Sequence, residues 1–304
     1  MGGIPAGETF EGTFTFAPHF SSAPGFRMHY VDEGSGEPII LIHGEPTWGY
    51  LYRNFIPPLS RRFRVIVPDH MGFGKSETPQ DADYTLARHA ANLGALIEEL
   101  DIRDITLVMQ DWGGPMGMVL ASRYPERIKR FVAMNTTFGT DRNVREPRLT
   151  PWFAAIKSME DSGQLEAVLG NLRHLAGAVM MMLGIQRREV VTDLWLRAYA
   201  APFATFEECK GAIAFPLEGL HLDRIRDTLV AALPGVYKLG QAGTPAMMIE
   251  GMQDRAIWPH VALAGFRAFF PRGTVHELEG VGHFIQEDAP EIVVPLIEEF
   301  CLRT

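Results

Sequence analysis

The chain has 304 residues, of which 46% are hydrophobic and 21% are charged, proportions typical of a globular protein with a large core. Its formal net charge of -9 and the lack of any run of Lys or Arg argue against a nucleic-acid-binding surface. No stretch approaches the ~20 apolar residues of a membrane span, and the amino terminus has no basic region followed by an apolar one. We therefore expect a cytoplasmic monomer with neither a nucleic-acid nor a membrane partner.

Short apolar and β-branched runs are predicted as strands at residues 39–42, 65–67, 105–109, 131–134, 246–249 and 274–278. Most are continuous rather than alternating, which is typical of a parallel sheet covered on both faces. Between the second and third runs, apolar side chains from Leu86 to Leu100 recur at helical spacing. Alternating strands and helices predict an α/β fold with a doubly wound, mostly parallel sheet.

This alternation breaks between residues 139 and 225. The pattern there is helical and rich in Met, Ala and Leu, and strand-like runs resume at Ala246. We predict one core domain formed by residues 1–138 and 226–304. The inserted segment, residues 139–225, is predicted to be a helical cap above the strand ends.

The most informative motif is Met109-Gln110-Asp111-Trp112-Gly113-Gly114, which ends one predicted strand and opens a helix-like stretch. This is the strand–turn–helix context of a nucleophile elbow, a sharp turn that usually presents a serine. Here the position belongs to Asp111. A carboxylate is already ionised at neutral pH and can attack an alkyl carbon directly, displacing a leaving group to form an ester. We predict Asp111 as the nucleophile.

A base and an acid follow in chain order. His283 lies in a loop after the last predicted strand, and Asp254 stands just past the strand at 246–249. The order nucleophile, acid, histidine is that of an elbow enzyme, in which the acid fixes the tautomer of the histidine. Asp254 could instead pair with Arg255 or cap a helix. The other place for such an acid, residues 135–137, holds no carboxylate, which favours Asp254.

A glycine-containing turn, His43-Gly44-Glu45-Pro46-Thr47-Trp48, follows the first predicted strand. Backbone N–H groups of Glu45 and Trp112 are predicted to form an oxyanion hole. His43 is predicted to brace this turn rather than to act as the base.

Together these motifs resemble the haloalkane dehalogenases of the α/β-hydrolase superfamily, and most of all the subgroup with an Asp-His-Asp triad. The matching stretches are HGEPTWGYLYR at 43–53, PDHMGFGKS at 68–76, QDWGG at 110–114, YAAPF at 199–203, GMQD at 251–254 and GHFIQE at 282–287. The specific part is the pairing of HGEPTW with QDWGG, since PDHMGFGKS marks only the superfamily.

The resemblance implies an α/β-hydrolase fold and the hydrolysis of small apolar haloalkanes to alcohol, halide and a proton. It implies an alkyl ester on Asp111 that water cleaves with the help of His283 and Asp254. The carboxyl group of Glu45 is implied to help hold that water. Substrate, water and the halide product are the only partners expected, and no cofactor or metal is expected, because the scattered histidines and the two cysteines show no ligand spacing.

A departing halide needs donors that are neither acids nor nucleophiles, and an indole N–H meets this need. Trp112 is the first predicted halide donor. The resemblance implies a second tryptophan from the cap, for which Trp152 is preferred because it comes early in the cap. Trp195, the other candidate, has the spacing of a core residue.

Two other function classes fit parts of the pattern. An epoxide hydrolase uses the same nucleophile but needs cap tyrosines to protonate an alkoxide, and the predicted cap contains only Tyr199. A non-catalytic receptor could keep the fold and the pocket, although here Asp111, Asp254, His283 and Trp112 are all present. The preferred halogen and chain length depend on the pocket volume, which the cap sets.

Overall fold

The computed structural model describes residues 3–138 and 148–304. In this part of the chain, one eight-stranded sheet has the order β1-β2-β4-β3-β5-β6-β7-β8. The strands are β1 (His19–Ser21), β2 (Met28–Gly34), β3 (Pro38–Ile42), β4 (Arg64–Pro68), β5 (Ile105–Gln110), β6 (Ile128–Met134), β7 (Ala246–Gly251) and β8 (Thr274–Leu278). Neighbouring strands from β4 to β8 in this order are parallel, whereas β2 pairs antiparallel with both β1 and β4.

All six predicted strands are confirmed, and β8 has its predicted bounds. Sequence analysis missed β1 and β2, because β1 has only three residues and β2 ends in the polar stretch Asp32-Glu33-Gly34. The mostly parallel sheet of the predicted α/β fold is therefore confirmed, with an antiparallel edge added.

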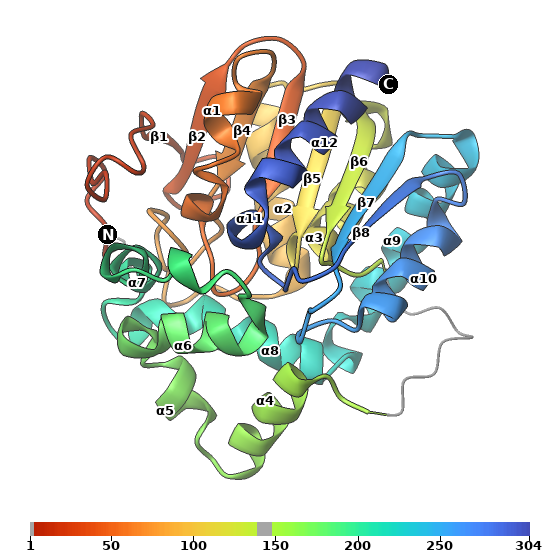
Figure 1. Ribbon diagram of the computed structural model, residues 1–304. Helices are drawn as coiled ribbons and strands as arrows, with labels where there is room; N and C mark the ends of the chain where they lie inside the picture. The colour runs from red at the N-terminus through yellow and green to blue at the C-terminus, as the bar shows by residue number, and fades with distance from the viewer. Residues whose placement is uncertain (1–2, 139–147) are drawn as a thin grey trace.

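Helices cover both faces of the sheet. The core helices are α1 (Ile56–Leu59), α2 (Leu86–Glu99), α3 (Gly113–Arg123), α9 (Asp223–Ala242), α10 (Pro259–Phe269), α11 (Ile285–Asp288) and α12 (Pro290–Arg303). In Figure 1, α12 crosses in front of the sheet, and α2 and α3 lie behind it. Short 3₁₀ helices complete the description: η1 (Gly49–Tyr52), η2 (Pro125–Arg127), η3 (Arg188–Val190), η4 (Ala201–Phe203) and η5 (Glu207–Cys209).

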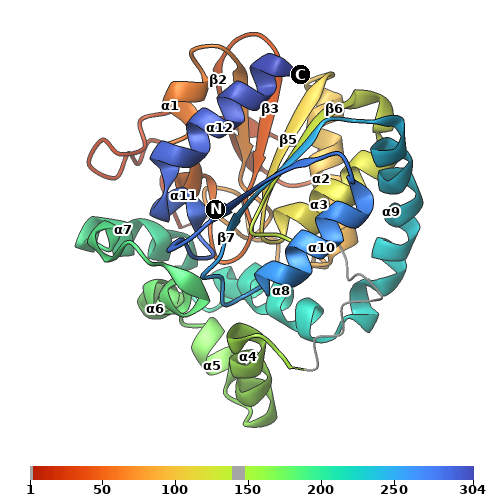
Figure 2. The same ribbon diagram turned by 45° about the vertical axis from the view of Figure 1, so that its right-hand side comes forward.

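Five helices lie together beyond the end of the sheet where β5 leads into α3 (Figures 1 and 2). They are α4 (Pro151–Asp161), α5 (Leu165–Leu169), α6 (Leu172–Gly184), α7 (Asp193–Ala200) and α8 (Lys210–Leu220). We propose this group as the cap. The predicted boundary at residue 225 falls inside α9, which begins at Asp223 and packs against α3 of the core. The predicted start at residue 139 lies outside the described residues.

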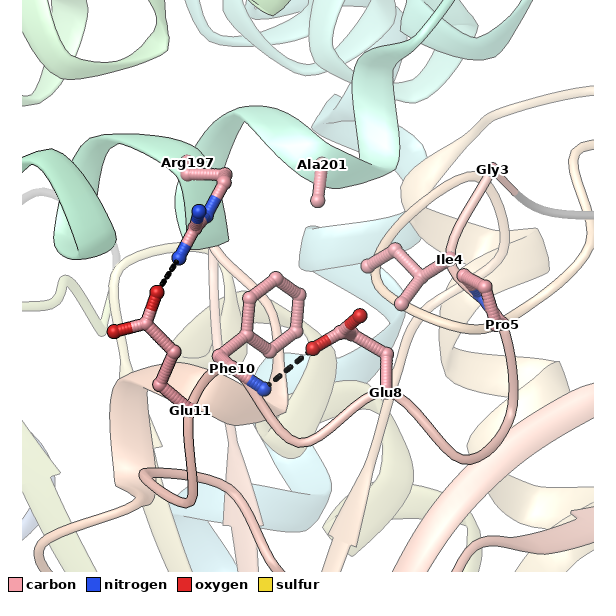
Figure 3. Close-up of a pocket in the computed structure, with 8 residues that line it drawn as sticks. All are labelled: Gly3, Ile4, Pro5, Glu8, Phe10, Glu11, Arg197 and Ala201. Carbon is pink, nitrogen blue, oxygen red and sulfur yellow. Dashed lines mark hydrogen bonds and ion pairs between the residues drawn. The ribbon is translucent and has the colours of Figure 1, made fainter.

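The amino-terminal segment joins the core to α7. Buried Lys75 donates to the carbonyl oxygens of Ala6 (2.8 Å) and Glu8 (2.9 Å). Glu11 pairs with Arg197 of α7 (Figure 3). A hollow of about 390 Å³ between the two segments is lined by Gly3, Ile4, Pro5, Glu8, Phe10, Glu11, Arg197 and Ala201. None of the predicted site residues lines this hollow.

Among residues 3–138 and 148–304, the helices are too short or too polar for any of them to cross a membrane.

Candidate active site

Asp111 occupies the turn between β5 and α3 with a backbone φ of 53°. This left-handed conformation costs a non-glycine residue about 1–2 kcal/mol, so the surroundings must hold it. Two glycines after Asp111 let neighbouring residues come close enough to hold the turn in this conformation. A Cβ on Gly113 would lie 2.4 Å from the carbonyl oxygen of Ile42, and one on Gly114 would lie 1.9 Å from Thr136 Oγ1. The Thr136 hydroxyl also donates to the carbonyl oxygen of Asp111 at 2.5 Å.

The carboxylate of Asp111 faces the turn that follows β3. Its Oδ1 accepts the backbone N–H of Glu45 at 2.8 Å, and its side chain is 13% exposed. A Cβ on Gly44 would lie 2.0 Å from the same oxygen. Only glycine therefore lets this backbone come close enough for the N–H of Glu45 to reach the carboxylate.

Asp254 lies in the loop after β7 and is buried. Its Oδ2 lies 2.8 Å from His283 Nδ1 and accepts from Asn135 Nδ2 at 2.9 Å. Its Oδ1 accepts the backbone N–H groups of Ala256 (2.7 Å) and Ile257 (3.0 Å). The same carboxylate thus orders the loop that leads to α10 and faces the imidazole.

His283 is fully buried between two carboxylates. Its Nε2 lies 3.4 Å from Asp111 Oδ2, opposite the nitrogen that faces Asp254. Burial opposes protonation of the ring, but the charges of Asp254 and Asp111 outweigh it and raise the pKa of His283 to about 10. The imidazole therefore lies between two carboxylates whose charges favour its protonated form.

Glu45 places a second carboxyl group close to that of Asp111. Burial, and then the charge of Asp111, raise the pKa of Glu45 well above its ordinary value, while His283 acts in the opposite direction. Its Oε1 is buried without a hydrogen-bond partner among the described residues. A neutral carboxyl group here can both donate and accept a hydrogen bond, as the orientation of a water molecule requires.

Aromatic side chains from two helices gather at Trp112, the residue after Asp111. The indole of Trp112 stacks on Phe215 of α8, with ring centroids 4.9 Å apart and an interplanar angle of 21°. A Cβ on Gly219 would lie 2.6 Å from the ring of Phe153 and 3.3 Å from Trp112. Phe153 of α4 is thus placed beside the first predicted halide donor.

Trp152, the other predicted halide donor, is buried at the first turn of α4. Its backbone N–H donates to the carbonyl oxygen of Arg255 at 3.1 Å, next to Asp254. Trp195 is also buried, and its ring packs on Tyr199 with centroids 4.7 Å apart. The core position expected for Trp195 is the one that the structure shows.

His43 and Tyr199 are both engaged away from the nucleophile. His43 Nδ1 lies 2.9 Å from the carbonyl oxygen of Gly44, and its Nε2 accepts the backbone N–H of His70 at 3.2 Å. The Tyr199 hydroxyl donates to Glu287 Oε1 at 2.5 Å, and Arg53 pairs with the same carboxylate.

Three polar side chains of the site were not predicted from the sequence. Asn135, with a φ of 40°, bonds both Asp254 and the backbone of Gly251. Gln110 Nε2 lies 3.1 Å from His283 Nε2. Asp288 accepts the N–H of Gly282, next to the histidine. Of these three residues, only Asn135 had a feature in the sequence that could have assigned it to the site, namely its position at the end of a predicted strand.

The described residues contain no group of three or more His, Cys, Asp or Glu side chains arranged to hold a metal ion. Within these residues, the site brings together the carboxylate of Asp111, the imidazole of His283 and the carboxylate of Asp254.

A family model described as alpha/beta hydrolase fold matches residues 37–290, so the chain belongs to the α/β-hydrolase family. Within that family it is related to the haloalkane dehalogenases. It is 35% identical to the haloalkane dehalogenase of Mycobacterium marinum over 305 residues, which cover 93% of this chain and 94% of that relative.

Another relative has a different activity. The cis-3-alkyl-4-alkyloxetan-2-one decarboxylase of Shewanella oneidensis is 34% identical over 297 residues, covering 95% of this chain and 89% of that relative. Among solved structures, the haloalkane dehalogenase DpaA from Paraglaciecola agarilytica NO2, described as tetrameric, superposes with a TM-score of 0.74. That comparison covers 94% of this chain and 92% of DpaA at 30% identity.

Proposed function

We propose that this protein is a haloalkane dehalogenase that hydrolyses small apolar haloalkanes through an alkyl ester on Asp111. One observation carries the proposal: a carboxylate stands at the elbow, 3.4 Å from the Nε2 of His283, whose Nδ1 is 2.8 Å from Asp254. The likeness to haloalkane dehalogenases over more than nine-tenths of the chain supports the choice of leaving group.

In the first step, an oxygen of Asp111 attacks the halogen-bearing carbon. A carbon–oxygen bond forms, the carbon–halogen bond breaks, and its electron pair leaves with the halide. We propose that the indole N–H groups of Trp112 and Trp152 receive this halide. The apolar ring of Phe153 beside Trp112 suits an apolar substrate.

In the second step, His283 takes a proton from water, and the water oxygen attacks the ester carbonyl of Asp111. The N–H groups of Glu45 and Trp112 stabilise the oxyanion. The alkyl oxygen then leaves with the proton from His283, and the regenerated carboxyl group of Asp111 ionises. The products are alcohol, halide and a proton.

The charges at the site suit this order of steps. Asp111 is one of the two carboxylates that raise the pKa of His283. Esterification removes the charge of Asp111, so the pKa of His283 falls when the ester forms. The histidine thus becomes a free base at the stage that needs one.

The position of Tyr199 argues against the epoxide hydrolase alternative. An epoxide must receive a proton on its oxygen as the ring opens. The Tyr199 hydroxyl is buried and donates to Glu287, which also pairs with Arg53. This phenol is therefore committed to an ion pair rather than available to a substrate.

A second candidate function comes from the decarboxylase relative, which matches 95% of this chain. An oxetan-2-one is a four-membered lactone in which an alkyl carbon carries an acyloxy leaving group. A carboxylate nucleophile could attack this carbon as it would attack a haloalkane. In that case the leaving group would be a carboxylate, and the indole of Trp112 would face it. Loss of carbon dioxide from this carboxylate would then form the carbon–carbon double bond of the alkene and expel the carboxylate of Asp111.

Covalent trapping tests the proposed function. A His283→Phe variant given 1-bromobutane should accumulate a butyl ester that peptide mapping places on Asp111, and an Asp111→Ala variant should not. Wild type should release bromide and butanol together. An absent adduct with an inactive wild type would refute the mechanism.

A substrate panel separates the alternatives. It should contain 1,2-dibromoethane, 1-chlorobutane, styrene oxide and a cis-3,4-dialkyloxetan-2-one. Diol from the epoxide without halide from the haloalkanes would favour the epoxide hydrolase. Alkene and carbon dioxide from the lactone, again without halide, would favour the decarboxylase. Inactivity toward all of them would favour a receptor.

We also propose that the protein is a cytoplasmic monomer. Light scattering in solution tests the oligomeric state, and a mass of four chains, as DpaA is described to have, would contradict it.

A further inference from the structure

A backbone segment of the proposed cap lies between the two loops that carry the acid and the base. It is the end of α6 and the residues that follow it, 183–187. The carbonyl oxygen of Leu183 accepts the N–H of Arg255 at 3.1 Å, next to the acid. The carbonyl oxygen of Gly184 accepts the N–H of Phe284 at 3.4 Å, next to the base.

One buried carboxylate joins this cap segment to the base loop. Asp288 Oδ1 accepts the backbone N–H groups of Gln186 and Arg187, both at 2.9 Å. Its Oδ2 accepts the N–H of Gly282 at 2.7 Å. Asp288 is 6% exposed and lies at the end of α11, five residues after His283. We call this arrangement of one carboxylate and three N–H groups the Asp288 clamp.

The two backbones touch without side chains between them. Gly184 has a φ of 135°, and a Cβ on it would lie 3.1 Å from the backbone nitrogen of His283. A Cβ on Gly282 would lie 2.4 Å from the carbonyl oxygen of Gly184. A displacement of the cap segment would therefore reach the backbone of the base directly.

We propose that Asp288 is a positioning residue. It couples the position of the cap segment, residues 183–187, to the position of His283. The clamp fixes the backbone next to His283 so that its Nδ1 meets Asp254 and its Nε2 faces Asp111. This inference rests on the proposed function. Because only the hydrolysis of the ester needs a base, release of the clamp should slow that step and spare the alkylation of Asp111.

An Asp288→Asn variant breaks the clamp with little change in volume. An amide offers one oxygen where the carboxylate offers two, and its NH₂ group would face a backbone N–H. If the oxygen keeps the two N–H groups of Gln186 and Arg187, the NH₂ faces Gly282. The base loop is then released from the cap segment.

Glu291→Gln provides the matched control. Glu291 is exposed and pairs with the side chain of Arg187, so the control removes the same charge close to the same segment. It leaves the three backbone N–H groups of the clamp bound to Asp288.

Single-turnover quench-flow with excess enzyme and 1,2-dibromoethane measures bromide release and alcohol release separately. For Asp288→Asn, we expect alcohol release to slow on the order of 10²-fold, the effect of about 1 Å of misplacement, while bromide release stays within about threefold of wild type. The control should match wild type in both. Equal slowing of both steps, or no change in either, would overturn the proposal.

Two further measurements test the proposal if the Asp288→Asn variant folds poorly or if the wild type is inactive. Gly184→Ala disturbs the same contact from the cap side and should slow the same step. Hydrogen exchange does not depend on the reaction: the amides of Gly282 and Gln186 should be protected in wild type, and Gly282 should lose protection in Asp288→Asn. Unchanged protection would overturn the clamp itself, whereas a wild type that releases no bromide would refute only the proposed function.

Discussion

Gly44 gives the sharpest test of how closely the nucleophile is held. In a Gly44→Ala variant, the new Cβ would lie 2.0 Å from Asp111 Oδ1, where ordinary contacts begin at 3.4 Å. The carboxylate and the turn must therefore separate by about 1.4 Å, the difference between these two distances. Such a shift also breaks the 2.8 Å hydrogen bond from Glu45. We expect alkylation to slow on the order of 10²-fold, equivalent to about 2.7 kcal/mol of activation free energy.

The assay is bromide release from 1,2-dibromoethane in a single turnover, with thermal unfolding measured in parallel. Gly7→Ala is the matched control, because a Cβ on Gly7 meets nothing within 4 Å. A folded Gly44→Ala variant that alkylates Asp111 within about threefold of wild type would refute the argument that this glycine sets the position of the nucleophile.

Three further predictions follow from the charges and hydrogen bonds of the site. Burial raises the pKa of Glu45 and so favours its neutral form, which an amide resembles. Glu45→Gln should therefore lose less than about tenfold in alcohol release and Glu45→Ala on the order of 10²-fold; equal losses in single-turnover assays would contradict a water-holding role. Lowering the pH through the pKa of His283 protonates the base, so the ester should accumulate on Asp111 at low pH. Because the ester carries no charge, the midpoint for hydrolysis should lie below the value of about 10 in the free enzyme, and a midpoint at or above the value that NMR gives for free enzyme would be inconsistent with this. Asn135→Ala leaves the buried N–H of Gly251, at the end of β7, without its partner and removes one of the two contacts of Asp254 Oδ2. It should lower the free energy of unfolding in urea by about 1–3 kcal/mol, whereas the exposed control Asn54→Ala should change it by less than about 0.5 kcal/mol.

The elements that sequence analysis found are those whose signals are local. A continuous apolar run followed by Asp111 and two glycines predicts a strand, a tight turn and a helix, because each part depends on its own residues. Five of the six parallel strands were found for the same reason: burial on both faces requires a continuous apolar run, which a single sequence displays. The exception is β8, an edge strand whose residues are exposed or half-buried.

The acid and the base were predicted from their order along the chain, and the structure brings them to within 2.8 Å of one another. Asn135 could not be assigned in this way, since its bond to Asp254 joins residues 119 positions apart. That contact depends on the register between β6 and β7, which pairs Met134 with Ile249.

The sequence by itself determined the core fold, because the fold follows from apolar periodicity. It also predicted an ester-forming nucleophile and the order of a triad, because these predictions follow from the chemistry of single residues. Only the tertiary structure decided what surrounds them. Successive helical residues point about 100° apart, so the docking of α4, rather than its composition, put Phe153 beside Trp112. Likewise, Asp288 joins residues 186–187 to the loop of His283 only because folding brings three backbone N–H groups from two distant segments to one carboxylate.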